Sequence, residues 1–414
     1  MSSSHLPLEV VEEILIHLVR IPFVYNSQNS DLLACALVSR TWLGAARGHM
    51  WDFDYFTIPR TQCKFTTLKR LYASPLCSLQ LDKISDIWAD PHNPLIPSFF
   101  EWCPPVFTGI NRIEIKPHGP SFDLEAATLQ KRIISAELPS LKSLRLYKIC
   151  FTSIDGFYEF LSSLKGLEHL QCHDVHLENR EAEGPDKLLT TPNVLMLDVD
   201  LGSFFELFYQ RVVLSGLQVL VFEEPFGDCF HGTRGSYSDT RRWSDIGDML
   251  AYTGHCLVRL KLCLLRKIGV TTLLSDVMDL PTKAPMLREL EVEIGDLINS
   301  DKLLPPMLSF KQPHLHLSTL KICRLPDDPI TFDRILERSI PRLQALTFSA
   351  PGVVQRDIMG ARWHIKLDDL QEGSLAWNTA RKYVSDVGDT MPWCNRRRCL
   401  FPVFLSSELW VAEL

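Results

Sequence analysis

The chain has 414 residues, of which 46% are hydrophobic and 22% are charged, a balance that is typical of soluble folded proteins. Its net charge of −7 at pH 7 argues against a general nucleic-acid binder, because such a protein needs a basic face that displaces counterions from phosphates. No apolar run approaches the ~18 residues that a membrane-spanning helix requires, so we expect neither nucleic acid nor a membrane among the partners.

Residues 5–51 predict three short helices. Pro7 can open the first helix, because the N–H that proline lacks has no helical partner at that position. Apolar residues then recur at helical spacing and form one stripe: Val10, Val11, Ile14, Leu15 and Leu18. Ser30 or Asp31 can cap a second helix, and Ser39 a third. Three helices of this size bury little surface alone, so they must pack as a cap on the rest of the chain or on a partner protein.

The order of motifs in this segment resembles the F-box. A Leu-Pro pair opens it at Leu6 and Pro7, a Val-Ser-Arg-x-Trp stretch runs from Val38 to Trp42, and a further tryptophan follows at Trp51. The resemblance implies that the helices dock on a Skp-family adaptor protein. Carried over by motif position, the adaptor-binding residues are Leu6, Pro7, Leu8, Ile14, Leu15, Leu33, Leu37, Val38 and Trp42.

A different pattern recurs ten times between Leu76 and Ser349. It consists of an apolar residue, two residues of any kind, an apolar residue, one residue of any kind and a third apolar residue. The ten copies begin at Leu76, Ile110, Leu141, Leu167, Val194, Leu217, Leu257, Leu287, Leu317 and Leu343. Each copy predicts a short strand, and helix-like spacing in the segments 156–164 and 202–213 predicts helices between strands. Leucine-rich repeats have this organisation, although several units here exceed their usual ~20–29 residues.

We therefore expect an α/β repeat, namely a divergent leucine-rich-repeat solenoid with a parallel sheet on its concave face, preceded by a small three-helix F-box domain. The expected domains are an F-box-like helical domain over 1–52, an irregular solenoid over 53–350 and a C-terminal capping region over 351–414. The repeat pattern stops at Pro351, and the tryptophans beyond it indicate a folded cap rather than a tail.

Side chains alternate along a strand, so the residues between and after the apolar positions should line the exposed face of the sheet. Nearly all of them are polar. Asp198, Asp200 and Glu223 stand in adjacent units, which predicts an acidic patch that prefers a basic segment of a protein ligand. A merely solvated face without a ligand is the alternative. The candidate substrate-binding residues are Arg145, Tyr147, His173, Asp198, Asp200, Glu223, Lys261, Glu291 and Glu293.

Motifs for metal binding and catalysis are not evident. His169 and His173 would share one face of a strand but lie about 13 Å apart, and Cys172 would point into the core. One Zn²⁺ ion, whose ligands sit at about 2.0–2.3 Å, cannot span that gap, so we expect no metal. The 12 cysteines include no Cys-x-x-Cys pair, which favours reduced thiols. Without a phosphate-binding loop, a dinucleotide fingerprint or a nucleophile elbow, we expect no cofactor and no enzyme activity.

F-box proteins that carry leucine-rich repeats resemble substrate receptors of SCF-type cullin–RING ubiquitin ligases. This resemblance implies a non-catalytic substrate-recognition subunit that binds the Skp adaptor and the cullin ligase core at one end and a protein target through its repeats. The alternative is a leucine-rich-repeat interaction scaffold with no ligase role. Acidic residues stand near the N-terminus, where a signal peptide would be basic and then apolar, so we expect a cytoplasmic or nuclear location, or both.

Overall fold

The computed structural model describes two compact units, which are treated separately below. The first comprises Met1–Gln171 and Val175–Ala182, and the second Cys172–Asp174 and Glu183–Leu414. The described residues are 7–20, 42, 56–73, 84–103, 108–117, 138, 140–178, 189–190, 194–208, 212–214, 216–223, 239–264, 278–294, 300–323, 325–349, 365–366, 382 and 385–404.

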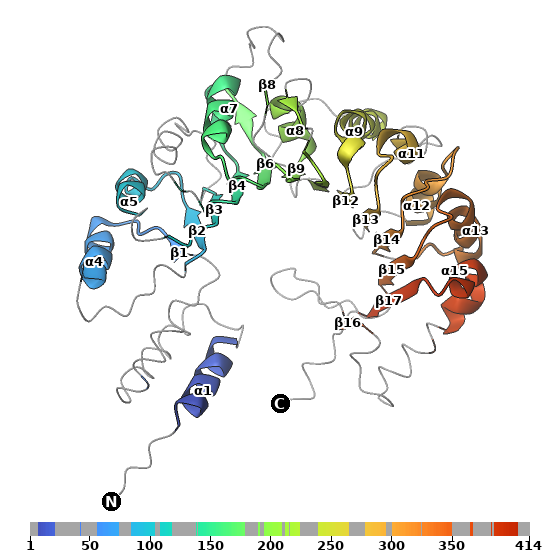
Figure 1. Cartoon of the computed structure of the whole chain (residues 1–414), viewed down its shortest axis with the longest axis horizontal. Helices are drawn as coiled ribbons and strands as arrows, with labels where there is room; N and C mark the ends of the chain where they lie inside the picture. The colour runs from blue at the N-terminus through green and yellow to red at the C-terminus, as the bar shows by residue number, and fades with distance from the viewer. Residues whose placement is uncertain are drawn as a thin grey trace, which may run out of the picture. The chain divides into compact units, whose positions relative to one another are not determined.

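In the first unit, parallel strands alternate with helices. The strands are β1 (Phe56–Thr57), β2 (Asp86–Ala89), β3 (Arg112–Ile115), β4 (Ser143–Tyr147) and the first residues of β6 (His169–His173), with a small parallel pair of β5 (Cys150–Phe151) and β7 (His176–Leu177). The helices are α1 (Leu8–Arg20), α4 (Gln62–Ala73), α5 (Ile96–Trp102) and α7 (Ile154–Ser163). Strands β1 to β4 pair in chain order, and α4, α5 and α7 lie on one side of them (Figure 1).

The second unit repeats this arrangement more regularly. Its parallel strands are the end of β6, β9 (Met196–Val199), β11 (Val219–Glu223), β12 (Arg259–Leu264), β13 (Glu289–Ile294), β14 (Thr319–Ile322), β15 (Ala345–Ser349) and β17 (Leu400–Phe404), while β16 (Ile365–Lys366) adds an antiparallel edge. Strands β8 (Leu189–Thr190) and β10 (Val212–Val213) form a separate parallel pair. The helical segments are α8 (Leu201–Leu207), α9 (Asp239–Thr253), η2 (Gly254–Cys256), α11 (Leu280–Lys283), α12 (Ser300–Leu308), α13 (Pro329–Ser339) and α15 (Pro392–Arg396).

One line of leucines runs across the second unit and holds its strands in register. The second apolar residue of each repeat pairs directly with its counterpart on the next strand, and every member is fully buried. We call this the leucine ladder: Leu197, Leu220, Leu260, Leu290, Leu320 and Leu346. Because a slip of one residue would turn each leucine toward water, burial of the ladder specifies the pairing of the strands.

The predicted α/β repeat is therefore confirmed as a large parallel sheet with helices between its strands. Nine of the ten predicted copies contain a strand, and the copy that begins at Leu76 lies outside the described residues. The predicted first N-terminal helix is present as α1, whereas the predicted second and third helices lie outside the described residues, except that Trp42 has a helical conformation.

The structure also departs from the predicted boundaries. Residues 212–213, predicted as the end of a helix, form β10, because helix α8 ends at Leu207. Strand β2 supplies a further repeat that is not among the ten predicted copies, since Ala89 occupies its third buried position in place of a larger apolar residue. Strand β17 lies in the predicted capping region and pairs in parallel with β15, so the sheet continues past residue 350.

None of the helices in the described part of the chain combines the length and the apolarity that a bilayer crossing requires.

A buried histidine joins neighbouring repeats of the second unit. His314 is almost fully buried, its Nε2–H donates to the carbonyl oxygen of Ala284 at 3.0 Å, and its Nδ1 accepts from the N–H of Leu317 at 3.0 Å. Both ring nitrogens are thus satisfied by the neutral imidazole. Burial lowers the pKa of His314, and a second proton on Nδ1 would face the N–H of Leu317.

We expect His314→Ala to lower the free energy of unfolding by about 1–3 kcal/mol, because two backbone groups lose a buried partner. The contribution of His314 to the free energy of unfolding should also fall as the pH drops below about 6.5, since the unfolded chain then takes up a proton that folded His314 does not bind. The difference between wild type and His314→Ala should therefore be smaller at pH 5.5 than at pH 7.5. Urea unfolding at pH 7.5 and 5.5 measures both effects. His316→Ala, at an exposed neighbouring position, is the control, and an equal loss in both variants would contradict the assignment.

Candidate functional site

The exposed face of the second unit's sheet carries the predicted polar side chains. Strand pairing aligns Asp198 with Val221, Val221 with Lys261, Lys261 with Glu291 and Glu291 with Lys321. These positions alternate with the leucine ladder, which points into the core, so the pleat of each strand brings them to the opposite face. The predicted site residues of this unit therefore come together in space, with one exception described below.

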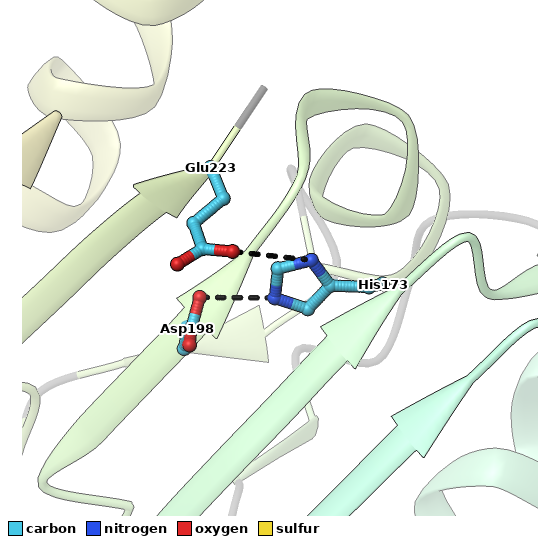
Figure 2. A group of neighbouring side chains, drawn as sticks. All are labelled: His173, Asp198 and Glu223. Atoms are coloured by element: carbon cyan, nitrogen blue, oxygen red, sulfur yellow. Dashed lines mark hydrogen bonds and ion pairs between the residues drawn. The ribbon is translucent and has the colours of Figure 1, made fainter. Parts of the chain in front are cut away.

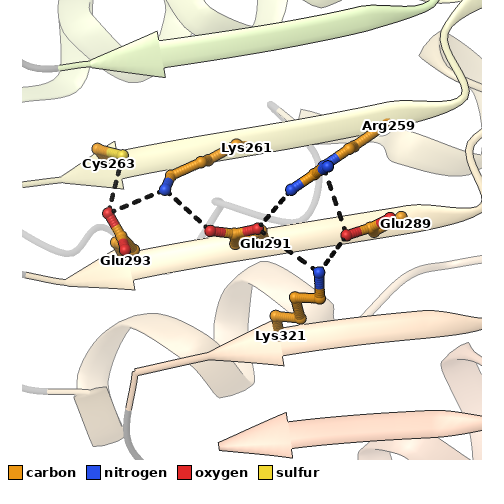
Figure 3. A network of polar contacts seen from close by, with 7 residues as sticks. All are labelled: Arg259, Lys261, Cys263, Glu289, Glu291, Glu293 and Lys321. Carbon is orange, nitrogen blue, oxygen red and sulfur yellow. Dashed lines mark hydrogen bonds and ion pairs between the residues drawn. The ribbon is translucent and has the colours of Figure 1, made fainter. Parts of the chain in front are cut away.

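A charge-balanced ion-pair network forms one cluster on this face (Figure 3). Its carboxylates are Glu289, Glu291 and Glu293 on β13, and its cations are Arg259 and Lys261 on β12 and Lys321 on β14. Glu291 is central, with Lys261 Nζ at 2.9 Å and an Arg259 guanidinium nitrogen at 3.0 Å.

The ion-pair network also changes the pKa of its central carboxyl group, that of Glu291. Burial opposes the ionisation of Glu291, but hydrogen bonds from Lys261 and Arg259 outweigh it, so its pKa lies below the usual range. Three cations facing three anions leave no net charge for a ligand. The predicted binding residues Lys261, Glu291 and Glu293 are thus ion-pair partners of one another. This arrangement favours a structural role, in which the network links β12, β13 and β14.

Sequence reasoning did not select Arg259, Glu289 and Lys321 as site residues. Strand alternation alone places them on the same face as Lys261 and Glu291. Their charges, matched across neighbouring strands, were the signal that could have identified the network.

A second cluster on the same face has a different charge balance (Figure 2). His173 of β6 faces two carboxylates, with Nε2 at 3.0 Å from Asp198 Oδ1 and Nδ1 at 4.0 Å from Glu223 Oε2. We call His173, Asp198 and Glu223 the His–carboxylate cluster. The side chains of His173 and Asp198 are only 13% and 14% exposed, whereas that of Glu223 is 42% exposed.

The electrostatics of the His–carboxylate cluster follow from this geometry. Burial alone would lower the pKa of His173, but the hydrogen bond and charge of Asp198, and then the charge of Glu223, raise it overall. Burial and the charge of Asp198 raise the pKa of Glu223. Two acids share one histidine, so the cluster is negatively charged whether or not the imidazole is protonated.

Asp200 does not belong to the exposed face, and its prediction as part of an acidic patch is wrong. The residue is only 3% exposed and is the N-cap of α8. Its Oδ1 accepts from the N–H of Ser203 at 3.0 Å, and its Oδ2 accepts from the Ser203 hydroxyl at 2.7 Å and the N–H of Asp174 at 2.6 Å. Strand β9 ends at Val199, so side-chain alternation no longer applies to Asp200.

The other predicted residues lie in the first unit. Arg145 lies 3.6 Å from a carboxylate oxygen of Glu114, and Tyr147 lies under the ammonium of Lys116, 5.3 Å from its ring centroid. Both predicted residues thus have a local partner on the neighbouring strand β3 or just after it. They form separate pairs within their own unit.

Of the predicted adaptor-binding residues, the structure places three on helix α1. Leu8 and Ile14 are exposed, while Leu15 is fully buried. Pro7 directly precedes the helix and is also exposed, and Trp42 is half-buried. The remaining predicted positions lie outside the described residues: Leu6, Leu33, Leu37 and Val38.

Comparison with known proteins adds little to this picture. No protein-family model matches the sequence, and no curated protein matches it. Among solved structures, 17 chains match. One belongs to the crystal structure of the TLR13–ssRNA13 complex, with 13% sequence identity and a TM-score of 0.22, and the match covers 64% of this chain and 41% of that chain. The likeness is weak, so the repeat architecture rests on the strand pairing described above.

The different roles of the two neighbouring aspartates can be measured. Asp200→Ala removes the acceptor of three hydrogen bonds, two of them buried, so we expect the free energy of unfolding to fall by about 1–3 kcal/mol. Asp198→Ala removes one hydrogen bond at the exposed face and should cost less, at about 1 kcal/mol. Urea unfolding of the two variants provides the comparison. The cap assignment would be contradicted if Asp198→Ala proved the more damaging change.

Proposed function

We propose that the chain is the non-catalytic substrate-recognition subunit of an SCF-type ubiquitin ligase. Its N-terminal F-box-like segment binds a Skp-family adaptor, and through it the cullin ligase core. Its parallel α/β repeats, interpreted as divergent leucine-rich repeats, bind a protein target. The observation that carries this proposal is the distribution of apolar side chains around helix α1.

Helix α1 has one apolar face that is buried and another that is exposed. Val11 and Leu15 are fully buried, whereas Leu8, Val10 and Ile14 are 47%, 41% and 38% exposed. Val10 and Ile14 are four residues apart, so their side chains are neighbours on the helix surface. The buried pair holds the helix to the chain, and the exposed residues remain available to another protein.

The exposed residues agree with the F-box resemblance in part. Leu8 and Ile14 are positions that the resemblance assigns to the adaptor, and Val10 lies beside Ile14. Exposed apolar side chains that gather on one helix favour a protein partner over plain solvation. Leu15, also assigned by the resemblance, supports the helix from its buried face.

In this proposal the ligase subunit acts by proximity. The adaptor-bound end holds the chain in the complex, the repeats hold the target, and the chemistry belongs to other subunits. The polar face of the sheet offers the surface for the target, and the cytoplasmic or nuclear location expected from the sequence suits such a complex.

The adaptor contact can be tested with the purified full chain and a purified Skp-family adaptor. We expect a saturable complex by isothermal titration calorimetry, weakened at least tenfold by Ile14→Asp and by Val10→Asp, because a charge replaces an apolar contact. Both side chains are exposed, so the thermal melting curve should stay near that of the wild type.

Glu12→Ala is the matched control, since Glu12 is exposed on the acidic side of the same helix. An adaptor that fails to bind the wild-type chain would exclude the ligase role and favour the leucine-rich-repeat scaffold. Binding that survives both Ile14→Asp and Val10→Asp would place the contact elsewhere and contradict the role of α1.

A further inference from the structure

The His–carboxylate cluster offers three metal-ligand side chains from three neighbouring strands. His173 comes from β6, Asp198 from β9 and Glu223 from β11. One ligand atom from each lies within 4.8 Å of the other two, and Figure 2 shows both carboxylates on the same side of the imidazole. From this arrangement we propose that the cluster binds one Zn²⁺ ion.

The donor atoms suit this ion. Zn²⁺ in proteins takes imidazole nitrogen at about 2.0–2.1 Å and carboxylate oxygen at about 2.0–2.2 Å, and three protein ligands with water at the fourth position are a familiar set. The short contact between His173 Nε2 and Asp198 Oδ1 has a proton between them. A divalent ion would replace that proton and be coordinated by both the nitrogen and the oxygen.

Both carboxylates have to move to hold the ion, Asp198 slightly and Glu223 further, because Glu223 now faces the other ring nitrogen, Nδ1. His173 and Asp198 are held at a mutual distance of 3.0 Å and are largely covered, so they form a prepared pair. When each ligand atom is about 2.1 Å from the ion, the ligand atoms lie closer to one another than the 4.8 Å that encloses them here. The Glu223 carboxylate must therefore move toward the other two ligand atoms. Its long side chain is 42% exposed, so rotation about its side-chain bonds supplies this movement.

The charge balance favours a cation at this place. In the ion-pair network, every glutamate has an arginine or lysine within ion-pair distance. Among the described residues, no lysine or arginine forms an ion pair with Asp198 or Glu223, whose ion-pair partner is His173. The charge of Lys261 acts on Glu223 only from beyond ion-pair distance. Two carboxylates at one imidazole leave excess negative charge, which a divalent ion would neutralise.

Bound Zn²⁺ would join three successive strands of the sheet by their exposed faces. It would act there as a structural cross-link, and its open coordination position would accept a water molecule. This site is independent of the adaptor contact at α1, so its test has no bearing on the ligase proposal.

The test uses the full chain after chelator treatment, with ZnCl₂ as the titrant in isothermal titration calorimetry. Because the chain has 13 histidines and 12 cysteines, zinc can also bind elsewhere, and variants isolate this site. We expect Glu223→Gln, a nearly isosteric change of an exposed side chain, to weaken one binding event by roughly tenfold or more, since even outer-shell changes cost 10–100-fold. Asp198→Asn should have at least the same effect.

His169→Ala is the matched control, because His169 lies on the same strand and is exposed. Wild type and this control should show the same zinc-dependent rise in melting temperature, which Glu223→Gln should lose. Co²⁺ in place of Zn²⁺ should give the spectrum of a site with nitrogen and oxygen ligands. Equal zinc binding in wild type and Glu223→Gln, no saturable binding, or a thiolate-to-cobalt band at the site that Glu223→Gln weakens would each overturn the proposal.

Discussion

The structure of the second unit depends on the burial of one leucine per repeat. The leucine ladder pairs each strand with the next at the same position, from Leu197 on β9 to Leu346 on β15. Transfer of a leucine side chain from water is worth about 1.5–3 kcal/mol, and a register slip would forfeit it in every strand at once. Because alternate side chains point to opposite faces, the ladder also determines which polar residues meet on the exposed side.

Two clusters on that exposed face show how the same rule yields different electrostatics. In the ion-pair network, Glu291 accepts from two cations on β12, and the charges cancel. In the His–carboxylate cluster, Asp198 and Glu223 share His173, and negative charge remains. The network is suited to hold strands together, whereas the cluster is suited to receive a cation. Both belong to the surface that the proposed receptor would offer to its target.

Helix α1 differs from the sheet because several of its apolar side chains are exposed to water. Val11 and Leu15 are buried, and a second set that includes Val10 and Ile14 is exposed. A helix needs only one apolar face to pack on its own chain. The second set therefore has a cost in the isolated chain that a bound partner would offset, which links this surface to the F-box resemblance of the segment.

The sequence by itself determined the repeat, because a strand period and three apolar positions per unit are local properties that can be counted along the chain. It also placed Asp198 and Glu223 on one exposed face. Only the tertiary structure decided that Asp200 turns inward as a helix cap, since the end of β9 depends on packing beyond the strand. Along the single strand that carries His169 and His173, the two imidazoles are too far apart to share one ion, so the sequence predicted no metal. The sheet brings His173, Asp198 and Glu223 together across three strands, and spacing along the chain carries no information about that distance.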